Sequence, residues 1–108
     1  MSKVENLKDT YRYLVGGYFG IREMDEYPLK EFVLKDIEEY IESFKNEYFI
    51  QDFDYEEEKR IVEVERPLVT KLQDSLLVLP KVNASMELVL LVKAKIKMLK
   101  DEKNKKNF

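Results

Sequence analysis

The chain has 108 residues, of which 44% are hydrophobic, and its formal net charge is −3. This length fits one domain with its own core. Cysteine and histidine are both absent, which excludes disulfides, thiolate nucleophiles and the commonest general base and metal ligand. Residues 1–14 lack the apolar stretch of a signal peptide, and no apolar run approaches the ~20 residues that span a bilayer. We therefore expect a cytoplasmic protein that does not insert into a membrane.

Charge is distributed unevenly along the chain. Residues 1–65 hold 18 acids and 9 bases, whereas residues 66–108 hold 4 acids and 10 bases. The acidic excess is densest in residues 36–65, with 12 carboxylates and only 3 bases. Such a clustered charge attracts and steers molecules of opposite sign. If the protein has a partner, we expect that partner to be cationic.

The first predicted helix covers residues 5–15, where apolar side chains recur at helical spacing and share one face. Gly16 or Gly17 is expected to end this helix, because glycine adopts the left-handed conformation of a helix terminus without steric cost. Residues 18–27 are then expected to form a loop.

A second helix is predicted over residues 29–48. Pro28 suits the first helical position, and an apolar stripe then continues for about five turns. The next segment is ambiguous, because residues 53–60 suit a polar helix start whereas residues 61–65 alternate like a β-strand. We favour a helix.

The last third of the chain begins with Pro67, which can open a further helix, although residues 76–80 could equally form a short buried strand. Asn83 or Ser85 can cap a final helix over residues 85–101. Residues 101–108 carry three lysines and two acids and have almost nothing to bury, so they are predicted to form a frayed, slightly basic tail.

Together these elements predict an all-α fold, in which residues 1–108 form one compact domain built as a bundle of about four or five helices. The alternative is an α+β fold with a short hairpin from residues 61–65 and 76–80.

The residue patterns of enzymes and metal sites are missing. The glycines of residues 16–20 lack the Lys-Ser or Lys-Thr of a phosphate-binding loop, and no serine lies in a nucleophile elbow. One acidic spacing matches a calcium loop, but Glu57 occupies the position that requires glycine. That spacing is formed by Asp52, Asp54, Glu56 and Glu63. We predict no enzymatic activity, no cofactor and no metal.

The acidic segment allows two interpretations, a solvated helix face or a partner-binding surface. Local pairs such as Glu42 with Lys45 contribute only ~0.2–0.5 kcal/mol each. Aromatic side chains alternate with the acids, a composition common at protein interfaces, although the same aromatics can belong to the core. The candidate partner-binding residues are Glu38, Glu39, Glu42, Glu47, Tyr48, Asp52, Phe53, Asp54, Tyr55, Glu57 and Glu58.

Residues 11–19 and the amphipathic helix that follows carry a resemblance to a known family. The sequence Tyr-Arg-Tyr-Leu-Val-Gly-Gly-Tyr-Phe, followed by an acidic loop, resembles the small immunity proteins of bacterial contact-dependent growth inhibition systems. The resemblance covers residues 7–45. The family's usual histidine, acid and tryptophan after the phenylalanine are replaced by residues 20–25, Gly-Ile-Arg-Glu-Met-Asp. The residues that match the family's motif are Gly16, Gly17, Tyr18 and Phe19, for which we expect a structural role.

The resemblance implies an antidote that binds and neutralises the toxic C-terminal domain of a cognate effector, commonly a nuclease. An acidic, aromatic surface could block the basic cleft of a nuclease without any chemistry of its own. One alternative is a phage- or plasmid-encoded inhibitor of another nucleic-acid-handling enzyme. Another is direct nucleic-acid binding through lysines of the last helix and tail, which the acidic composition disfavours. Those lysines are Lys93, Lys95, Lys97, Lys100, Lys103, Lys105 and Lys106.

Overall fold

The computed structural model describes residues 3–106, with side chains up to residue 102. Across these residues the chain forms five α-helices and one short 3-10 helix, with no strand. The elements are α1 (Lys3–Glu23), α2 (Lys30–Glu47), α3 (Tyr55–Glu65), α4 (Leu68–Val78), η1 (Leu79–Val82) and α5 (Met86–Lys106). The predicted all-α fold is confirmed. The alternative hairpin does not form, because residues 61–65 belong to α3 and residues 76–80 to α4 and η1.

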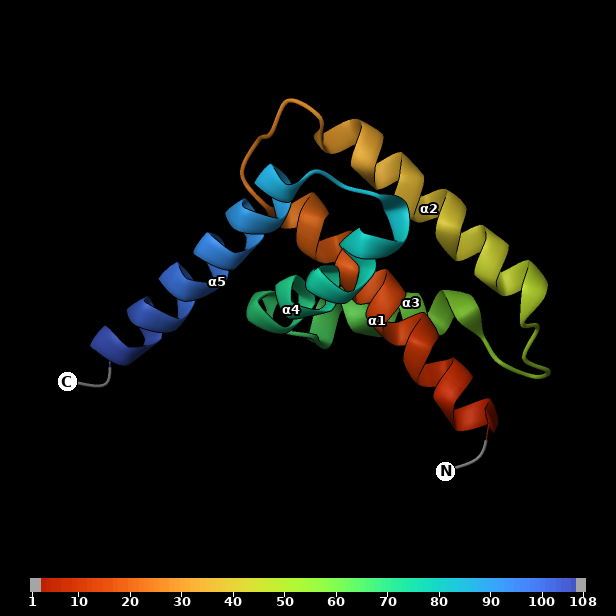
Figure 1. Cartoon of the computed structure of the whole chain (residues 1–108). Coiled ribbons are helices and arrows are strands. Elements are labelled where there is room, and N and C mark those ends of the chain that lie inside the picture. Colours follow the sequence, from red (N-terminus) through yellow and green to blue (C-terminus); the bar gives the residue numbers. More distant parts are fainter. Residues whose placement is uncertain (1–2, 107–108) are drawn as a thin grey trace.

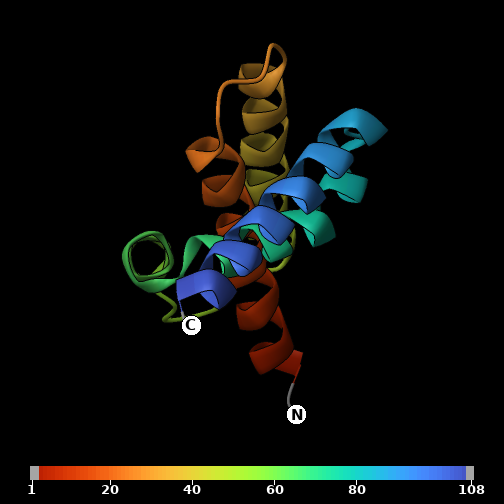
Figure 2. The same cartoon turned by 90° about the vertical axis from the view of Figure 1, so that its left-hand side faces the viewer.

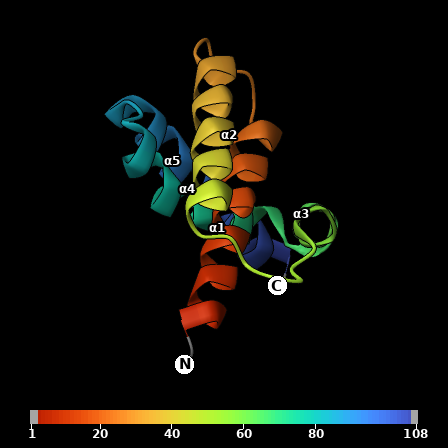
Figure 3. The ribbon, with the colours of Figure 1, turned by 90° about the vertical axis from the view of Figure 1, so that its right-hand side faces the viewer.

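Helix α1 passes through the middle of the molecule and contacts α2, α3 and α4 (Figure 1). Helix α5 is nearest the viewer in Figure 2 and α2 is nearest the viewer in Figure 3, so these two helices flank the molecule on opposite sides. The core draws on every α-helix, with α1 supplying its largest buried side chains, such as Tyr11 and Phe19.

The prediction for the end of α1 is wrong. Gly16 and Gly17 lie inside the helix and are buried, and no glycine of the described residues has a positive φ. The helix continues to Glu23, so residues 18–23, predicted as loop, are helical. The prediction failed because a pair of glycines is compatible both with the end of a helix and with a close crossing of two helices.

The three glycines of α1 allow α4 to approach closely. A Cβ atom on Gly17 would lie 2.7 Å from Cγ2 of Val78 and 3.1 Å from the Cα of Ser75. A Cβ on Gly20 would lie 2.6 Å from the carbonyl oxygen of Lys71, and one on Gly16 would collide with the carboxylate of Asp74. Each glycine costs ~0.8–1.0 kcal/mol of helix propensity relative to alanine. The close packing of two helix backbones offsets that cost.

Buried charges surround this crossing, and each has a partner. Asp74 accepts a hydrogen bond from a guanidinium nitrogen of Arg66 at 2.5 Å. Lys71 is 4% exposed and donates to the Glu23 carboxylate and to the Glu63 carbonyl, both at 2.7 Å. Burial raises the pKa of Asp74, and Arg66 acts in the opposite direction. Lys71 with Glu23 links α4 to α1, whereas the contacts of Arg66 and Glu63 link α4 to the end of α3. Removing one member of such a pair would leave a buried charge alone, which is strongly destabilising.

The other helices follow the predictions more closely. The prediction of residues 29–48 corresponds to α2, and the favoured helix at the ambiguous segment is α3. Ser85 caps α5, its hydroxyl oxygen accepting from the Leu88 amide at 3.3 Å. Helix α5 continues to Lys106, so residues 101–106 are helical where fraying was predicted. The end of the predicted tail, residues 107–108, lies outside the described residues.

Candidate partner-binding surface

Acidic residues from α2 and α3 meet around one pocket of about 330 Å³ on the surface. Helix α1 supplies two tyrosines and one valine. Helices α2 and α3 together supply three carboxylates, two ammonium groups and one isoleucine. The lining residues are Tyr11, Val15, Tyr18, Glu38, Ile41, Glu42, Lys45, Glu56 and Lys59. We call this the α2–α3 pocket. It combines carboxylate acceptors with aromatic rings, the groups that hold a lysine or arginine side chain.

Two contacts hold the carboxylates of α2 at the pocket. The Tyr18 hydroxyl donates to Oε1 of Glu38 at 2.7 Å, and Lys45 lies 3.4 Å from Oε1 of Glu42. Burial and the hydrogen bond to Glu38 raise the pKa of Tyr18, so its hydroxyl stays protonated as the donor. Glu56 also lines the pocket; its side chain is exposed and forms no ion pair with any described residue. The pocket therefore offers acceptor atoms to a ligand.

Phe53 and Tyr55, predicted as interface aromatics, pack against Tyr11. The ring centroids of these side chains lie 5.7 Å and 4.9 Å from that of Tyr11, edge to face. The Tyr11 hydroxyl donates to the Tyr55 carbonyl at 3.0 Å, and the Tyr55 hydroxyl accepts from the Ile50 amide at 3.0 Å. Burial, followed by the charge of Glu56, raises the pKa of Tyr11. This aromatic cluster packs the α2–α3 connection against α1.

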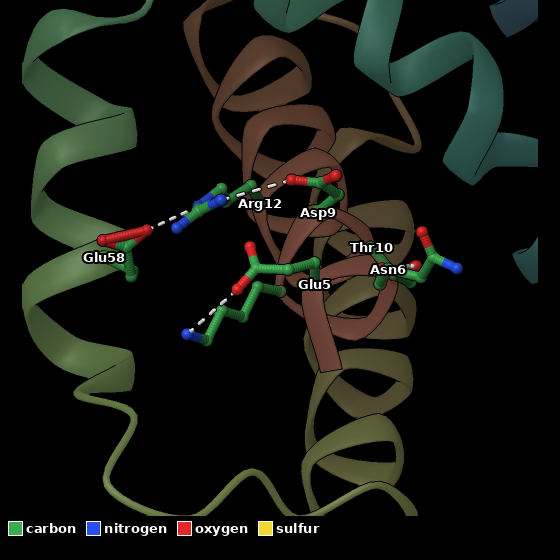
Figure 4. Close-up of polar contacts among 7 residues, drawn as sticks. Glu5, Asn6, Asp9, Thr10, Arg12 and Glu58 are labelled. Atoms are coloured by element: carbon green, nitrogen blue, oxygen red, sulfur yellow. Dashed lines mark hydrogen bonds and ion pairs between the residues drawn. The ribbon is translucent and has the colours of Figure 1, made fainter. Parts of the chain in front are cut away.

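Three of the predicted acidic residues hold the start of α3 in place. Asp54 caps the helix by accepting from the Glu57 amide at 3.0 Å. Glu58 reaches across to α1 and accepts from Nε of Arg12 at 2.5 Å, while Arg12 also contacts Asp9 (Figure 4). Glu57 pairs with Arg60 at 2.7 Å, and the hydrogen bond from Arg60 lowers the pKa of Glu57. These carboxylates support local structure.

The remaining predicted acids are Glu39, Glu47 and Asp52, which are exposed and make no ion pair within the described part of the chain. Glu39 lines a separate shallow hollow beside η1, with Lys81 and Val82. It therefore lies apart from the α2–α3 pocket. Asp52 has a φ of 60° in the turn between α2 and α3. The structure thus brings Glu38 and Glu42 together and places Glu39 elsewhere on α2.

The segment after α2 adds exposed aromatic surface. Tyr48 is 40% exposed and packs on Phe44 with ring centroids 5.2 Å apart, whereas Phe49 is 75% exposed. Phe49 is the most exposed large apolar side chain among the described residues. Phe49 is one of the aromatics that alternate with the acids in this segment, although the candidate set drawn from the sequence did not include it.

The candidate set also omitted Tyr11, Tyr18 and Glu56. Tyr11 and Tyr18 are seven residues apart, so they share a face only if the helix continues through the glycines. Because the helix was expected to end at Gly16 or Gly17, the two tyrosines were not predicted to share a face. Glu56 lies near Glu42 only through tertiary packing, for which the sequence carries no local pattern.

No protein-family model matches the chain, and no curated protein or solved structure matches it. Within residues 3–106, none of the helices has an apolar stretch of the length that a membrane crossing requires. Over the same residues, no three acidic side chains converge as ligands for a metal ion. The candidate site is therefore defined by its geometry alone.

Proposed function

We propose that the protein binds a basic protein domain at the α2–α3 pocket and acts in the cytoplasm as an immunity protein, neutralising the toxic domain of a contact-dependent growth inhibition effector. The observation that carries this proposal is the meeting of Glu38, Glu42 and Glu56 at one surface pocket, and the segment that follows α2 adds the exposed aromatic Phe49. Carboxylates gathered on one surface speed the capture of a cationic partner, and an exposed aromatic anchors it.

The proposed mechanism is steric and electrostatic. A lysine or arginine of the partner enters the α2–α3 pocket and pairs with Glu42 and Glu56, which line it from two helices. Phe49 packs on the partner beside that contact. If the partner is a nuclease, its basic cleft is then occupied and cannot reach a phosphate backbone. This mechanism requires no catalytic group on the antidote.

The experiment that tests this proposal starts with the product of the adjacent upstream gene, purified as its C-terminal domain. Titration calorimetry measures its binding to the wild-type protein and to the variant Glu42→Lys/Glu56→Lys. We expect the variant to lose at least about tenfold in affinity at low salt, equivalent to ~1.4 kcal/mol. High salt should weaken the wild type more than the variant, because exposed charges are screened.

The matched control is Glu65→Lys/Glu102→Lys, which makes the same change in net charge at exposed positions away from the pocket. Equal weakening by both variants would mean that net charge acts without a defined site, and the pocket would not be the interface. If the neighbouring gene product does not bind but another nucleic-acid-handling enzyme co-purifies, the chain is an inhibitor of that enzyme. A loss of binding in Phe49→Ala alone would place the interface on the α2–α3 connection.

A further inference from the structure

Helix α5 carries apolar side chains on two sides. Its inner side is buried against the rest of the molecule through Leu88, Val92 and Ile96. Its outer side exposes Leu90 at 57%, Leu91 at 45% and Met98 at 56%. A stripe of apolar side chains on a helix is normally buried against another element. None of the described residues covers this outer side.

The exposed residues form a continuous stripe along this outer side. Positions 87, 90, 91, 94 and 98 recur at spacings of three and four, so they lie on one face of the helix. The stripe contains Glu87, Leu90, Leu91, Ala94 and Met98, all of them exposed, with Lys97 at its edge. Helix α5 lies outermost on its side of the molecule (Figure 2), so a second helix can reach it.

We propose that α5 pairs with α5 of a second copy of this chain, the two helices running antiparallel with a two-fold axis at the level of Val92. In this register Glu87 faces Lys97 of the second copy. Leu90 faces Ala94, and the two Leu91 side chains flank the axis, each opposite position 93 of the other copy. An antiparallel pair needs such a self-complementary pattern, since each contact occurs twice.

Charge favours this register over one with the axis at the level of Ala94. Moving the axis to the level of Ala94 would set Glu87 against Asp101 and Lys93 against Lys95, both like-charge pairs. With the axis at Val92, no two like charges stand directly opposite over residues 83–101. The same charges disfavour an anionic lipid surface as the occupant, because Glu87 and Asp101 lie on the apolar face itself.

The dimer is compatible with partner binding on the other side. Helices α5 and α2 flank the molecule on opposite sides (Figures 2 and 3), so pairing through α5 leaves the α2–α3 pocket open. The contact stripe spans 12 residues, or roughly 18 Å of helix. This short contact predicts a weak dimer, with a dissociation constant in the micromolar range.

Sedimentation equilibrium of the full chain, at concentrations from about 5 to 500 µM, measures the dissociation constant. The variant Leu90→Glu/Leu91→Glu should weaken the dimer at least about tenfold, because it would bury carboxylates in the contact. The matched control is Phe32→Glu, at a 67% exposed aromatic on α2, and should leave the constant unchanged. Circular dichroism verifies that every variant keeps its helical content. A chain that stays monomeric, or a dimer that only Phe32→Glu disrupts, overturns the proposal.

Charge exchange tests the register. Glu87→Lys should weaken the dimer, since it sets two lysines against each other twice, and Glu87→Lys/Lys97→Glu should restore it. The chain has no cysteine, so Lys100→Cys gives one spin label per copy. In the antiparallel register the two labels are separated by about 24 Å along the helix axis, whereas a parallel pair would place them side by side. A short label distance, or no rescue by the exchanged pair, refutes the register.

Discussion

The α1–α4 crossing and the α2–α3 pocket differ in what their polar residues do. At the crossing, charged side chains are buried, and Lys71 and Asp74 each have a close partner. At the pocket, Glu42 and Glu56 are exposed, and the ion pair of Glu42 is a loose one of 3.4 Å. At the crossing, the charged groups are therefore paired within the structure and link α4 to α1 and α3. The pocket keeps its charges accessible to a ligand.

The same difference is found within the Gly-Gly-Tyr motif of α1. Gly16 and Gly17 face α4 and permit the close approach, whereas Tyr18 bonds to Glu38 of α2. Adjacent residues of α1 therefore serve opposite sides of the same helix. The paired glycines, the most recognisable feature of the sequence, belong to the scaffold, and the candidate site depends on less distinctive residues.

The largest effect is expected from Gly17→Val. Its Cβ would lie 2.7 Å from Val78 and 3.1 Å from the backbone of Ser75, so α4 must move away. We expect the free energy of unfolding to fall by about 3 kcal/mol in urea denaturation. Asn6→Val, at an exposed position of α1, should change the free energy of unfolding little, because asparagine and valine have similar helix propensities. An unchanged Gly17→Val protein would contradict the close crossing.

A smaller effect is expected from Arg66→Met, which leaves Asp74 buried without its partner. We expect a loss of about 2 kcal/mol at neutral pH, below the full value because Arg66 is partly exposed. Burial already raises the pKa of Asp74, and without Arg66 that pKa rises further. The loss is therefore present above the folded-state pKa and shrinks as pH falls through it, because the buried carboxyl becomes neutral.

Urea denaturation of this variant at neutral pH and near pH 4 measures that change. The double variant Arg66→Met/Asp74→Asn has no carboxyl at this position. Its loss of unfolding free energy relative to the wild type should therefore vary less with pH. A deficit in Arg66→Met that stays constant over the same range would show that Asp74 does not carry the cost.

The smallest effects on stability are expected within the acidic segment. They should distinguish acids that hold the fold together from acids that are accessible at the pocket. Asp54→Ala removes the cap of α3 and should cost about 1 kcal/mol. Glu42→Gln breaks only an exposed pair with Lys45 and should cost less than about 0.5 kcal/mol. Thermal denaturation of the two variants side by side tests the difference. Equal costs would mean that the pocket carboxylates also stabilise the fold.

The helices that could be predicted from the sequence are those with a local apolar stripe. The stripe of α2 placed that helix to within one residue at each end, and Ser85, one of the two predicted caps, stands at the start of α5. These patterns depend only on residues three or four apart.

The site and the crossing could not be predicted in the same way. Burial of Lys71 depends on Glu23 and Glu63, which come from two other helices. The pocket likewise requires Glu42 and Glu56 to meet across two helices. Such contacts have no local period, and the tyrosines of α1 became visible as one face only once the helix was known to continue through the glycines.

The glycine-lined crossing has a consequence for how the chain folds as it is synthesised. Three glycines weaken the middle of α1, and the partner that compensates for them, α4, begins at Leu68. Contacts so far apart in sequence form late, since a long loop must close first. A nascent chain that ends before α4 therefore exposes apolar surface on α1, and we expect it to depend on chaperones until the second half has left the ribosome.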